Sequence, residues 1–86
     1  MTKKEKYEAL PDHLKNMVIC WRFPNVLHKD IADFTGGALS KSRLANLKCE
    51  GEAPPTFRIF KRNASDIVDM TYWIYKRTQQ MNKKEN

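Results

Sequence analysis

The pair Pro54-Pro55 is the feature that most constrains how this chain of 86 residues folds. Proline has no backbone N–H, fixes its own φ and moves the preceding residue away from helical conformation. A helix that contains Leu44 and Leu47 therefore has to end before the prolines, and Gly51 supplies a C-terminal stop. The segment that follows cannot begin as a central strand, because a central strand needs the N–H that proline lacks.

Apolar and basic residues alternate directly after the prolines, in the run "FRIFKR" from Phe57 to Arg62. An alternation with a period of two predicts a strand, with Phe57 and Ile59 on one face and Arg58, Phe60 and Arg62 on the other. The residues 63–65 then form either the tip of a hairpin or a short return strand.

Helical spacing of apolar residues predicts four helices, at residues 10–23, 26–37, 40–51 and 65–80. Gly36-Gly37 ends the second helix and Ser40 caps the third, so that this pair forms a helix-turn-helix. Ser65 or Asp66 caps the last helix. The inward residues are Leu14, Met17, Val18 and Trp21, then Val26 or Leu27 with Ile31 and Phe34, then Leu44 and Leu47, and finally Ile67, Met70, Trp73 and Ile74.

The charge of the chain favours a polyanionic partner. Lys and Arg number 16 against 10 Asp and Glu, which gives a net charge of +6. Six basic and two acidic residues fall between Lys41 and Arg62, a net +4 within 22 residues. Nucleic acid is the first candidate and an anionic membrane surface the second. The alternative is a basic face that has no such partner.

Several other classes of function find no support in the residues. Cys20 and Cys49 lack the spacing of a zinc site and are expected to be reduced thiols, so no metal and no cofactor are expected. His13 and His28 are isolated and lack the spacing of metal ligands. A solvent-exposed position is expected for His28, and the alternative is a contact with a phosphate. We find no nucleophile with a neighbouring base and no glycine-rich phosphate loop, which argues against an enzyme. No apolar run is long enough to span a membrane, and a cytoplasmic location is expected.

The predicted helix at residues 40–51 has the composition of a DNA-reading helix. With Leu44 and Leu47 inward, the opposite face carries small and polar side chains. Arg and Lys pair with guanine and Asn pairs with adenine in the major groove, usually from the first turns of such a helix. The candidate base-reading residues are Lys41, Ser42, Arg43 and Asn46. The alternative is an ordinary solvated helix face.

The basic strand adds a second candidate contact. Arg58, Lys61 and Arg62 are expected to bind phosphates or a narrow minor groove beside the helix. In this interpretation the proline pair turns the chain so that helix and hairpin face the same duplex. The alternative is an edge strand whose charges prevent aggregation.

Three stretches, "LKCEGEAPP", "FRIFKR" and "DMTYWI", occur in order between His28 and Lys76. This succession resembles the small winged helix-turn-helix family of phage excisionases and AlpA-like regulators, which is related to the MerR DNA-binding domain. The resemblance implies a recognition helix near Lys41 and a wing at residues 60–65. The chain departs from the family pattern at Phe60, where the family has glycine, in the return strand "NAS", and in its longer N-terminal segment 1–25.

The sequence thus predicts a mainly α fold with a small β-hairpin, in the form of a winged helix-turn-helix. Residues 1–9 are expected to be flexible, residues 10–76 to form the DNA-binding domain with an extra N-terminal helix, and residues 77–86 to form a polar tail. The resemblance implies an excisionase of a phage or mobile element.

Such a protein binds and bends attachment-site DNA and directs an integrase toward excision. Its partners are double-stranded DNA, further copies of itself on the DNA and the integrase, in the cytoplasm of a prokaryotic cell or infected host and associated with the nucleoid. The alternatives are an AlpA-like transcriptional regulator and a protein-interaction adaptor with an incidental basic face.

Overall fold

The computed structural model describes residues 2–85, and over this range it contains five α-helices, one short 3-10 helix and a three-stranded antiparallel sheet. Helices therefore dominate, with a small sheet, as the sequence predicts. In chain order the elements are α1 (Lys3–Glu8), α2 (Asp12–Cys20), β1 (Asn25–Leu27), η1 (His28–Asp30), α3 (Ile31–Phe34), α4 (Lys41–Cys49), β2 (Phe57–Ile59), β3 (Arg62–Asp66) and α5 (Ile67–Glu85).

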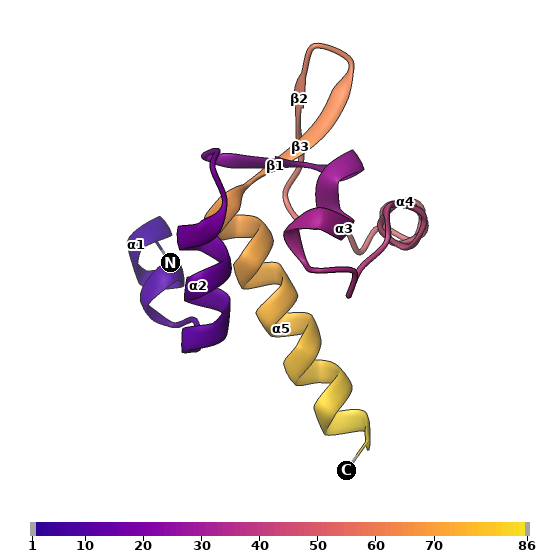
Figure 1. The fold of residues 1–86 in the computed structure, drawn as a ribbon. Helices are drawn as coiled ribbons and strands as arrows, with labels where there is room; N and C mark the ends of the chain where they lie inside the picture. Colours follow the sequence, from indigo (N-terminus) through magenta and orange to yellow (C-terminus); the bar gives the residue numbers. More distant parts are fainter. Residues whose placement is uncertain (1, 86) are drawn as a thin grey trace.

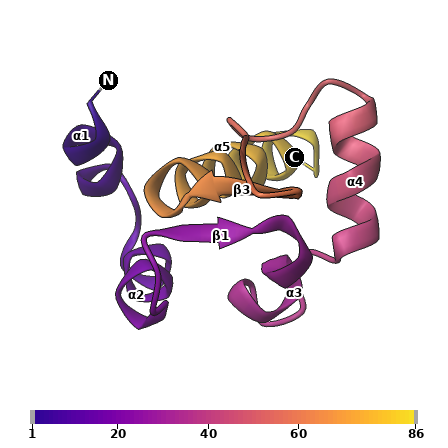
Figure 2. The same cartoon turned by 90° about the horizontal axis from the view of Figure 1, so that it is seen from above.

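The strand β3 lies at the centre of the sheet, in the order β1-β3-β2. Its inner half pairs with β1, where Val26 lies opposite Ser65, and its outer half pairs with β2, where Ile59 lies opposite Arg62. The hairpin of β2 and β3 extends away from the helices, and α5 runs in the other direction (Figure 1). Viewed from above, β1 and β3 lie between α2 on one side and α4 on the other (Figure 2).

The hydrophobic core lies where the sheet, α3, α4 and the first turns of α5 meet. Val26, Ile31 and Met70 are fully buried. Trp21 packs edge-on against Phe34 with 5.3 Å between the ring centroids, and its indole Nε1 donates to the carbonyl of Asn25. The predicted inward residues of all four predicted helices are buried or half-buried, which confirms that part of the prediction.

The prediction of one helix over residues 26–37 is wrong at its start. Val26 and Leu27 belong to strand β1, and the helical backbone begins only at His28 as a 3-10 turn. The physical reason is long-range: the inner edge of β3 needs a hydrogen-bonding partner, and the β-branched Val26 fits that buried position. The spacing of apolar residues is the same for either structure over so short a run.

The predicted faces of the hairpin are also corrected. Residues 63–65 are part of the return strand, and the tip consists of Phe60 and Lys61. Because Arg62 pairs with Ile59 across this two-residue turn, the two side chains lie on the same face. The expected grouping of Arg62 with Arg58 assumed one continuous strand, whereas the turn reverses the chain and restarts the alternation.

Two glycines end the helices α3 and α4. Gly36 has φ +66° and follows α3, and Gly51 has φ +77° and follows α4. In each case the next residue closes the turn: Gly37 N–H donates to the Ala32 carbonyl and Glu52 N–H to the Leu47 carbonyl. This pattern is the Schellman motif, which needs a residue that tolerates positive φ. Gly51 therefore acts as the predicted stop before the prolines.

The two ends of the chain are more helical than the sequence suggests. Residues 1–9 were expected to be flexible, but helix α1 begins with a capping box between Thr2 and Glu5 and packs against α5. The expected polar tail from residue 77 is the continuation of α5 as far as Glu85. A capping box is a local signal that "TKKE" carries, whereas the packing of α1 on α5 is not visible in the sequence.

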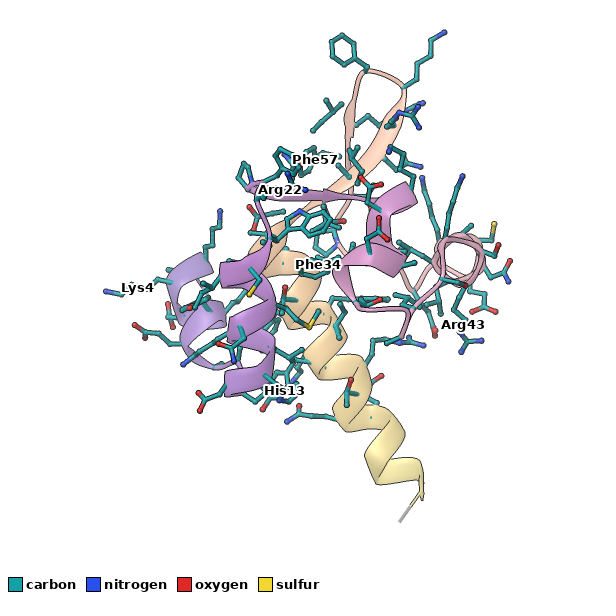
Figure 3. The ribbon with its side chains drawn as sticks, viewed as in Figure 1. Lys4, His13, Arg22, Phe34, Arg43 and Phe57 are labelled. Atoms are coloured by element: carbon teal, nitrogen blue, oxygen red, sulfur yellow. The ribbon has the colours of Figure 1, made fainter. Side chains whose placement is uncertain are left out.

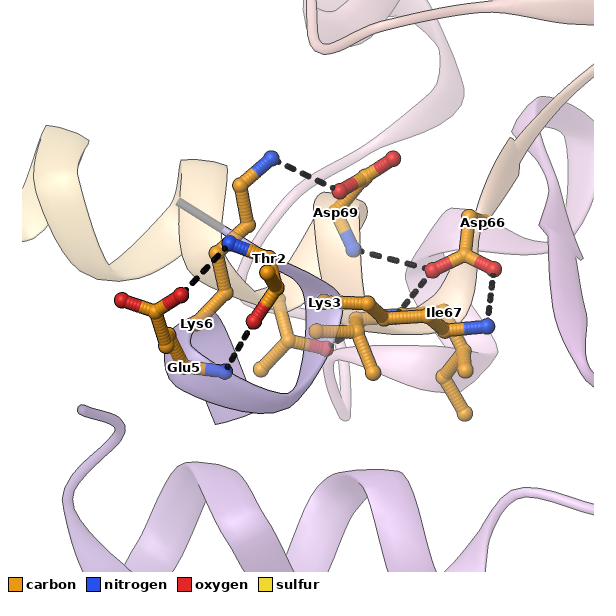
Figure 4. Close-up of polar contacts among 9 residues, drawn as sticks. Thr2, Lys3, Glu5, Lys6, Asp66, Ile67 and Asp69 are labelled. Carbon is orange, nitrogen blue, oxygen red and sulfur yellow. Dashed lines mark hydrogen bonds and ion pairs between the residues drawn. The ribbon is translucent and has the colours of Figure 1, made fainter. Parts of the chain in front are cut away.

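Asp66 joins the sheet, α5 and α1 (Figure 4). Its Oδ2 accepts hydrogen bonds from the N–H groups of Val68 and Asp69, so Asp66 rather than Ser65 caps α5. Its Oδ1 lies 2.7 Å from Lys3 Nζ, and Asp69 Oδ1 lies 3.0 Å from Lys6 Nζ. One carboxylate thus stabilises the start of α5 and holds α1 beside it.

Asp66 allows the cap and the charge to be tested separately. Asp66→Ala removes both, and we expect the free energy of unfolding to fall by about 1–2 kcal/mol. Asp66→Asn keeps a capping oxygen and removes the charge, and we expect a loss of no more than about 0.5 kcal/mol because Lys3 is largely exposed. Urea unfolding of the two variants measures both values, and equal losses would contradict a capping role.

Candidate functional site

The helix α4 lies at one side of the molecule with most of its surface exposed. Leu44 and Leu47 attach it to the body, at 1% and 5% exposure, while the other side chains from Lys41 to Cys49 are exposed. Ser40 caps the helix as predicted, since its Oγ accepts from the N–H of Arg43 at 3.1 Å. The end of the helix with free N–H groups and positive dipole is therefore well formed and open to solvent.

The exposed surface of α4 divides into three rows. Ser42, Asn46 and Cys49 follow the spacing i, i+4, i+7 and lie opposite the buried leucines, while Lys41, Ala45 and Lys48 form a neighbouring row. Arg43 lies on the other flank. It lines a cleft of about 640 Å³ toward α2 and α5, together with Trp73, Arg77 and other residues, and Figure 3 shows it on the side of α4 away from the hairpin.

The basic residues of the hairpin point in different directions. Arg58 lies opposite Asn63, on the sheet face that farther along carries Ser65 and Val26. Arg62 lies on the reverse face beside Ile59, and Lys61 is at the tip. The guanidinium of Arg58 donates from Nη2 to the carbonyl of Lys61 at 3.3 Å, which holds it across the turn. All three predicted basic side chains are exposed.

His28 connects the hairpin strand to α4. Its Nε2 shares a hydrogen bond of 3.0 Å with Ser65 Oγ, and Ser65 is fully buried on the face of β3 that also bears Arg58 farther out. Burial first, and the positive charge of Lys48 second, lower the pKa of His28 below its ordinary 6.5. The short helix η1 that carries His28 contacts both β3 and α4. The expectation of a solvated His28 is corrected, because the ring is half-buried.

The loop between α4 and β2 is fixed to α5. Trp73, which was expected in the core, is half-buried against it and donates from Nε1 to the carbonyl of Glu52 at 3.0 Å. Arg77 binds the Glu52 carboxylate at 2.9 Å and lies over the Trp73 ring. Pro54 is buried in the same loop. These contacts fix the path of the chain from α4 to the hairpin.

Three acidic side chains of the loop, β3 and α5 pair with basic residues outside α4 and the hairpin, while Glu50 at the end of α4 is exposed. Asp66 and Asp69 pair with lysines of α1, and Glu52 pairs with Arg77 of α5. Within the described residues, no ion pair joins a basic side chain of α4 or of the hairpin to an acidic one. The positive charge of these two elements therefore remains available to a partner.

We call this region the α4–hairpin surface. It combines hydrogen-bond donors, cations and small side chains. The described part of the chain places no three His, Cys, Asp or Glu side chains together as a group able to hold a metal. The surface consists of Lys41, Ser42, Ala45, Asn46, Lys48 and Cys49 of α4 with Arg58, Phe60, Lys61 and Arg62 of the hairpin.

Two residues of this surface were not among the site residues predicted from the sequence. Lys48 was counted only as charge, although its spacing from Lys41 places both on one row of α4. Phe60 was placed on a strand face and noted as a departure from a family pattern, but it was not a site candidate, and it is 98% exposed. Of the base-reading candidates, Lys41, Ser42 and Asn46 lie together on the α4–hairpin surface, and Arg43 lies apart from them.

Comparison with known proteins gives no relative: the chain matches no protein-family model, no curated protein and no solved structure. Among residues 2–85 there is also no helix with the length and apolar character needed to cross a bilayer. Any function must therefore be argued from the residues of this chain.

The position of His28 makes stability depend on pH. Its pKa is lowered in the folded state, so the unfolded chain binds a proton at a higher pH than the folded chain does. We expect the free energy of unfolding to fall as the pH decreases from about 7 to 5, and His28→Gln to remove that part of the dependence. NMR titration of the ring gives the pKa directly. Lys48→Gln should raise it and Lys4→Gln, on α1, should not; an equal response to both would contradict the placement of Lys48.

Proposed function

We propose that this protein binds double-stranded DNA through the α4–hairpin surface, as a winged helix-turn-helix. The order of elements supports the fold assignment: a helix, an edge strand, two short helices joined by a tight turn and a hairpin whose second strand pairs with the edge strand. In this arrangement α4 is the recognition helix and the β2–β3 hairpin is the wing. The protein acts as a binding protein and not as an enzyme.

One observation carries the proposal: two basic, exposed elements are held in a fixed relation by contacts that do not involve their basic side chains. His28 and Ser65 connect β3 to the base of the helix-turn-helix, and Trp73 with Arg77 holds the intervening loop through Glu52. A solvated surface with no partner does not need its two elements to be held at a fixed relative position. A DNA-binding surface does, because groove and backbone contacts have to be made together.

The rows of α4 suggest separate roles for its residues. Ser42 and Asn46 lie on the row farthest from the body and are placed to reach base edges, and Lys41 lies beside them. Lys48 lies on the same row as Lys41, where we assign it to a phosphate. Arg43 lies on the opposite flank of α4. If α4 enters a major groove, this flank faces the second DNA strand that borders the groove. We therefore reassign Arg43 from base reading to a contact with a phosphate of that strand.

The hairpin supplies cations to both sides of its tip. Arg58 lies on the face toward α4, Arg62 lies on the reverse face and Lys61 lies between them at the turn. A minor groove has a phosphate backbone on each side, so cations on both faces suit a wing that enters it. The role of Arg58, Lys61 and Arg62 in backbone or minor-groove contact is thus retained.

The biological role of an excisionase rests on the sequence resemblance alone. An excisionase binds several adjacent sites and bends them, while a regulator needs only a promoter site. Selection of bound fragments from the source genome at about physiological salt separates the two. Clustered direct repeats beside an integrase site support the excisionase, and a single site over a promoter supports the regulator. The absence of any enriched fragment would favour the protein-interaction adaptor and overturn the proposal.

Asn46 tests the reading role of α4. Asn46→Ala should weaken binding to the selected sequence by about 1–3 kcal/mol, because it removes a pair of hydrogen bonds to a base. Binding to random duplex should change little. The matched control is Asn16→Ala, an exposed asparagine on α2, which should affect neither. Equal losses on selected and random DNA would place Asn46 on the backbone.

Lys61 tests the wing. Lys61→Gln should weaken binding to all duplexes alike and reduce the slope of log K against log salt by about 0.9, which corresponds to one phosphate contact. Lys4→Gln removes one exposed lysine from α1 and should leave the slope unchanged. Fluorescence anisotropy over a series of salt concentrations measures both, and an unchanged slope for Lys61→Gln would contradict a phosphate contact at the tip.

A further inference from the structure

Phe60 occupies an unfavourable position for an aromatic residue. It is the first of the two residues in the hairpin turn, its φ is +56° and its side chain is 98% exposed. Glycine or asparagine normally takes such a position, because a Cβ is strained at positive φ. An exposed phenyl ring also gains nothing from burial. The residue therefore carries two costs that the fold itself does not explain.

The hairpin that carries the Phe60 ring is held rigidly by hydrogen bonds. The turn is closed by the pairing of Ile59 with Arg62 and is crossed by the hydrogen bond from Arg58 to the Lys61 carbonyl. Farther in, β3 is paired on both edges. Figure 1 shows that the hairpin projects beyond every other element at this end of the molecule. Phe60 is thus held at the outermost point, at a fixed place relative to α4.

The side chains around Phe60 suit a polyanion that contains stacked bases, such as a nucleic acid duplex. Arg58, Lys61 and Arg62 all lie within two residues of Phe60 and on both faces of the hairpin. A base stack offers an apolar interior between two rows of phosphates, which matches an apolar ring between cations. A membrane surface also offers anions above an apolar layer. A single phenyl ring gives little apolar area for insertion into a membrane, and the other residue of the turn, Lys61, is charged.

We propose that Phe60 is a wedge that enters the minor groove and inserts between two base pairs, so that the duplex kinks toward the major groove. This inference rests on the proposed DNA-binding function and adds to it the residue that deforms the DNA. Inserted apolar side chains are known to unstack a step and to bend the duplex by about 20–90° toward the major groove.

The test uses a duplex of about 20–30 bp that carries the selected sequence, with 2-aminopurine placed in turn at purines of the protected minor groove. The wild-type protein should raise the fluorescence at one step, because the base there loses its stacking partner. Phe60→Gly removes the ring and accepts the positive φ, so it should fold at least as stably as the wild type. It should bind without raising the fluorescence, whereas Phe60→Leu should retain part of the signal.

A mismatch at the same step gives a second readout. A mismatched step is already partly unstacked, so the wild type should bind that duplex roughly tenfold more tightly than the intact one. Phe60→Gly should bind the intact and the mismatched duplex with equal affinity. Lys61→Gln should bind both duplexes more weakly than the wild type and should keep the preference for the mismatched one. A gel-based bend measurement should show the kink with the wild type and its loss with Phe60→Gly.

The outcomes separate this inference from the proposed function. If the wild type binds the selected duplex and Phe60→Gly gives the same fluorescence, preference and bend, the wedge is wrong and the DNA-binding function stands. If the wild type binds no duplex, the proposed function itself fails. If Phe60 instead governs binding to vesicles of phosphatidylserine and phosphatidylcholine while no base unstacks, the ring belongs to a membrane contact and the wedge is overturned.

Discussion

The pairing of β3 with a strand on each of its edges is the interaction on which the rest of this structure depends. At its inner half, Ala64 and Ser65 are fully buried between β1 and the helices, so the strand is part of the core. At its outer half the same strand leaves the body as one side of the hairpin. At its end, Asp66 caps α5. A movement of this strand would change the core, the hairpin and the long helix together.

This dependence explains how a small chain presents two separated elements in one orientation. Domains of this size bury a limited core and have little stability to spare. Here the position of the hairpin relative to α4 is set by a few specific contacts, namely His28 with Ser65 and Trp73 with Glu52, in addition to the core itself. The basic side chains take no part in these contacts. Their charges therefore remain available to a partner, and Arg58 in addition donates a hydrogen bond across the hairpin turn.

The sequence predicted the helices and core well where the signal is local. Leu44 with Leu47 gave the buried face of α4, and Gly51 gave its end before Pro54. The errors came from long-range pairing. Strand β1 exists because β3 lies beside it, and nothing in "NVL" distinguishes a strand from the first turn of a helix. The candidate site followed the same rule. Ser42, Asn46 and the flank position of Arg43 could be placed from helix geometry. The cleft that Arg43 lines toward α2 and α5 and the exposure of Phe60 depended on the packing of α5 and on the position of the turn.

The central claim is that α4 and the hairpin engage one duplex at the same time. The most direct measurement is the shift of backbone amide resonances as the selected duplex is added to the labelled protein. The account predicts saturable shifts that are largest on the exposed rows of α4 and over residues 57–63, with α1 and the exposed side of α2 unaffected. Shifts confined to the α2 and α5 walls of the cleft that Arg43 lines, or to the exposed apolar residues Ile19 and Phe23, would contradict it.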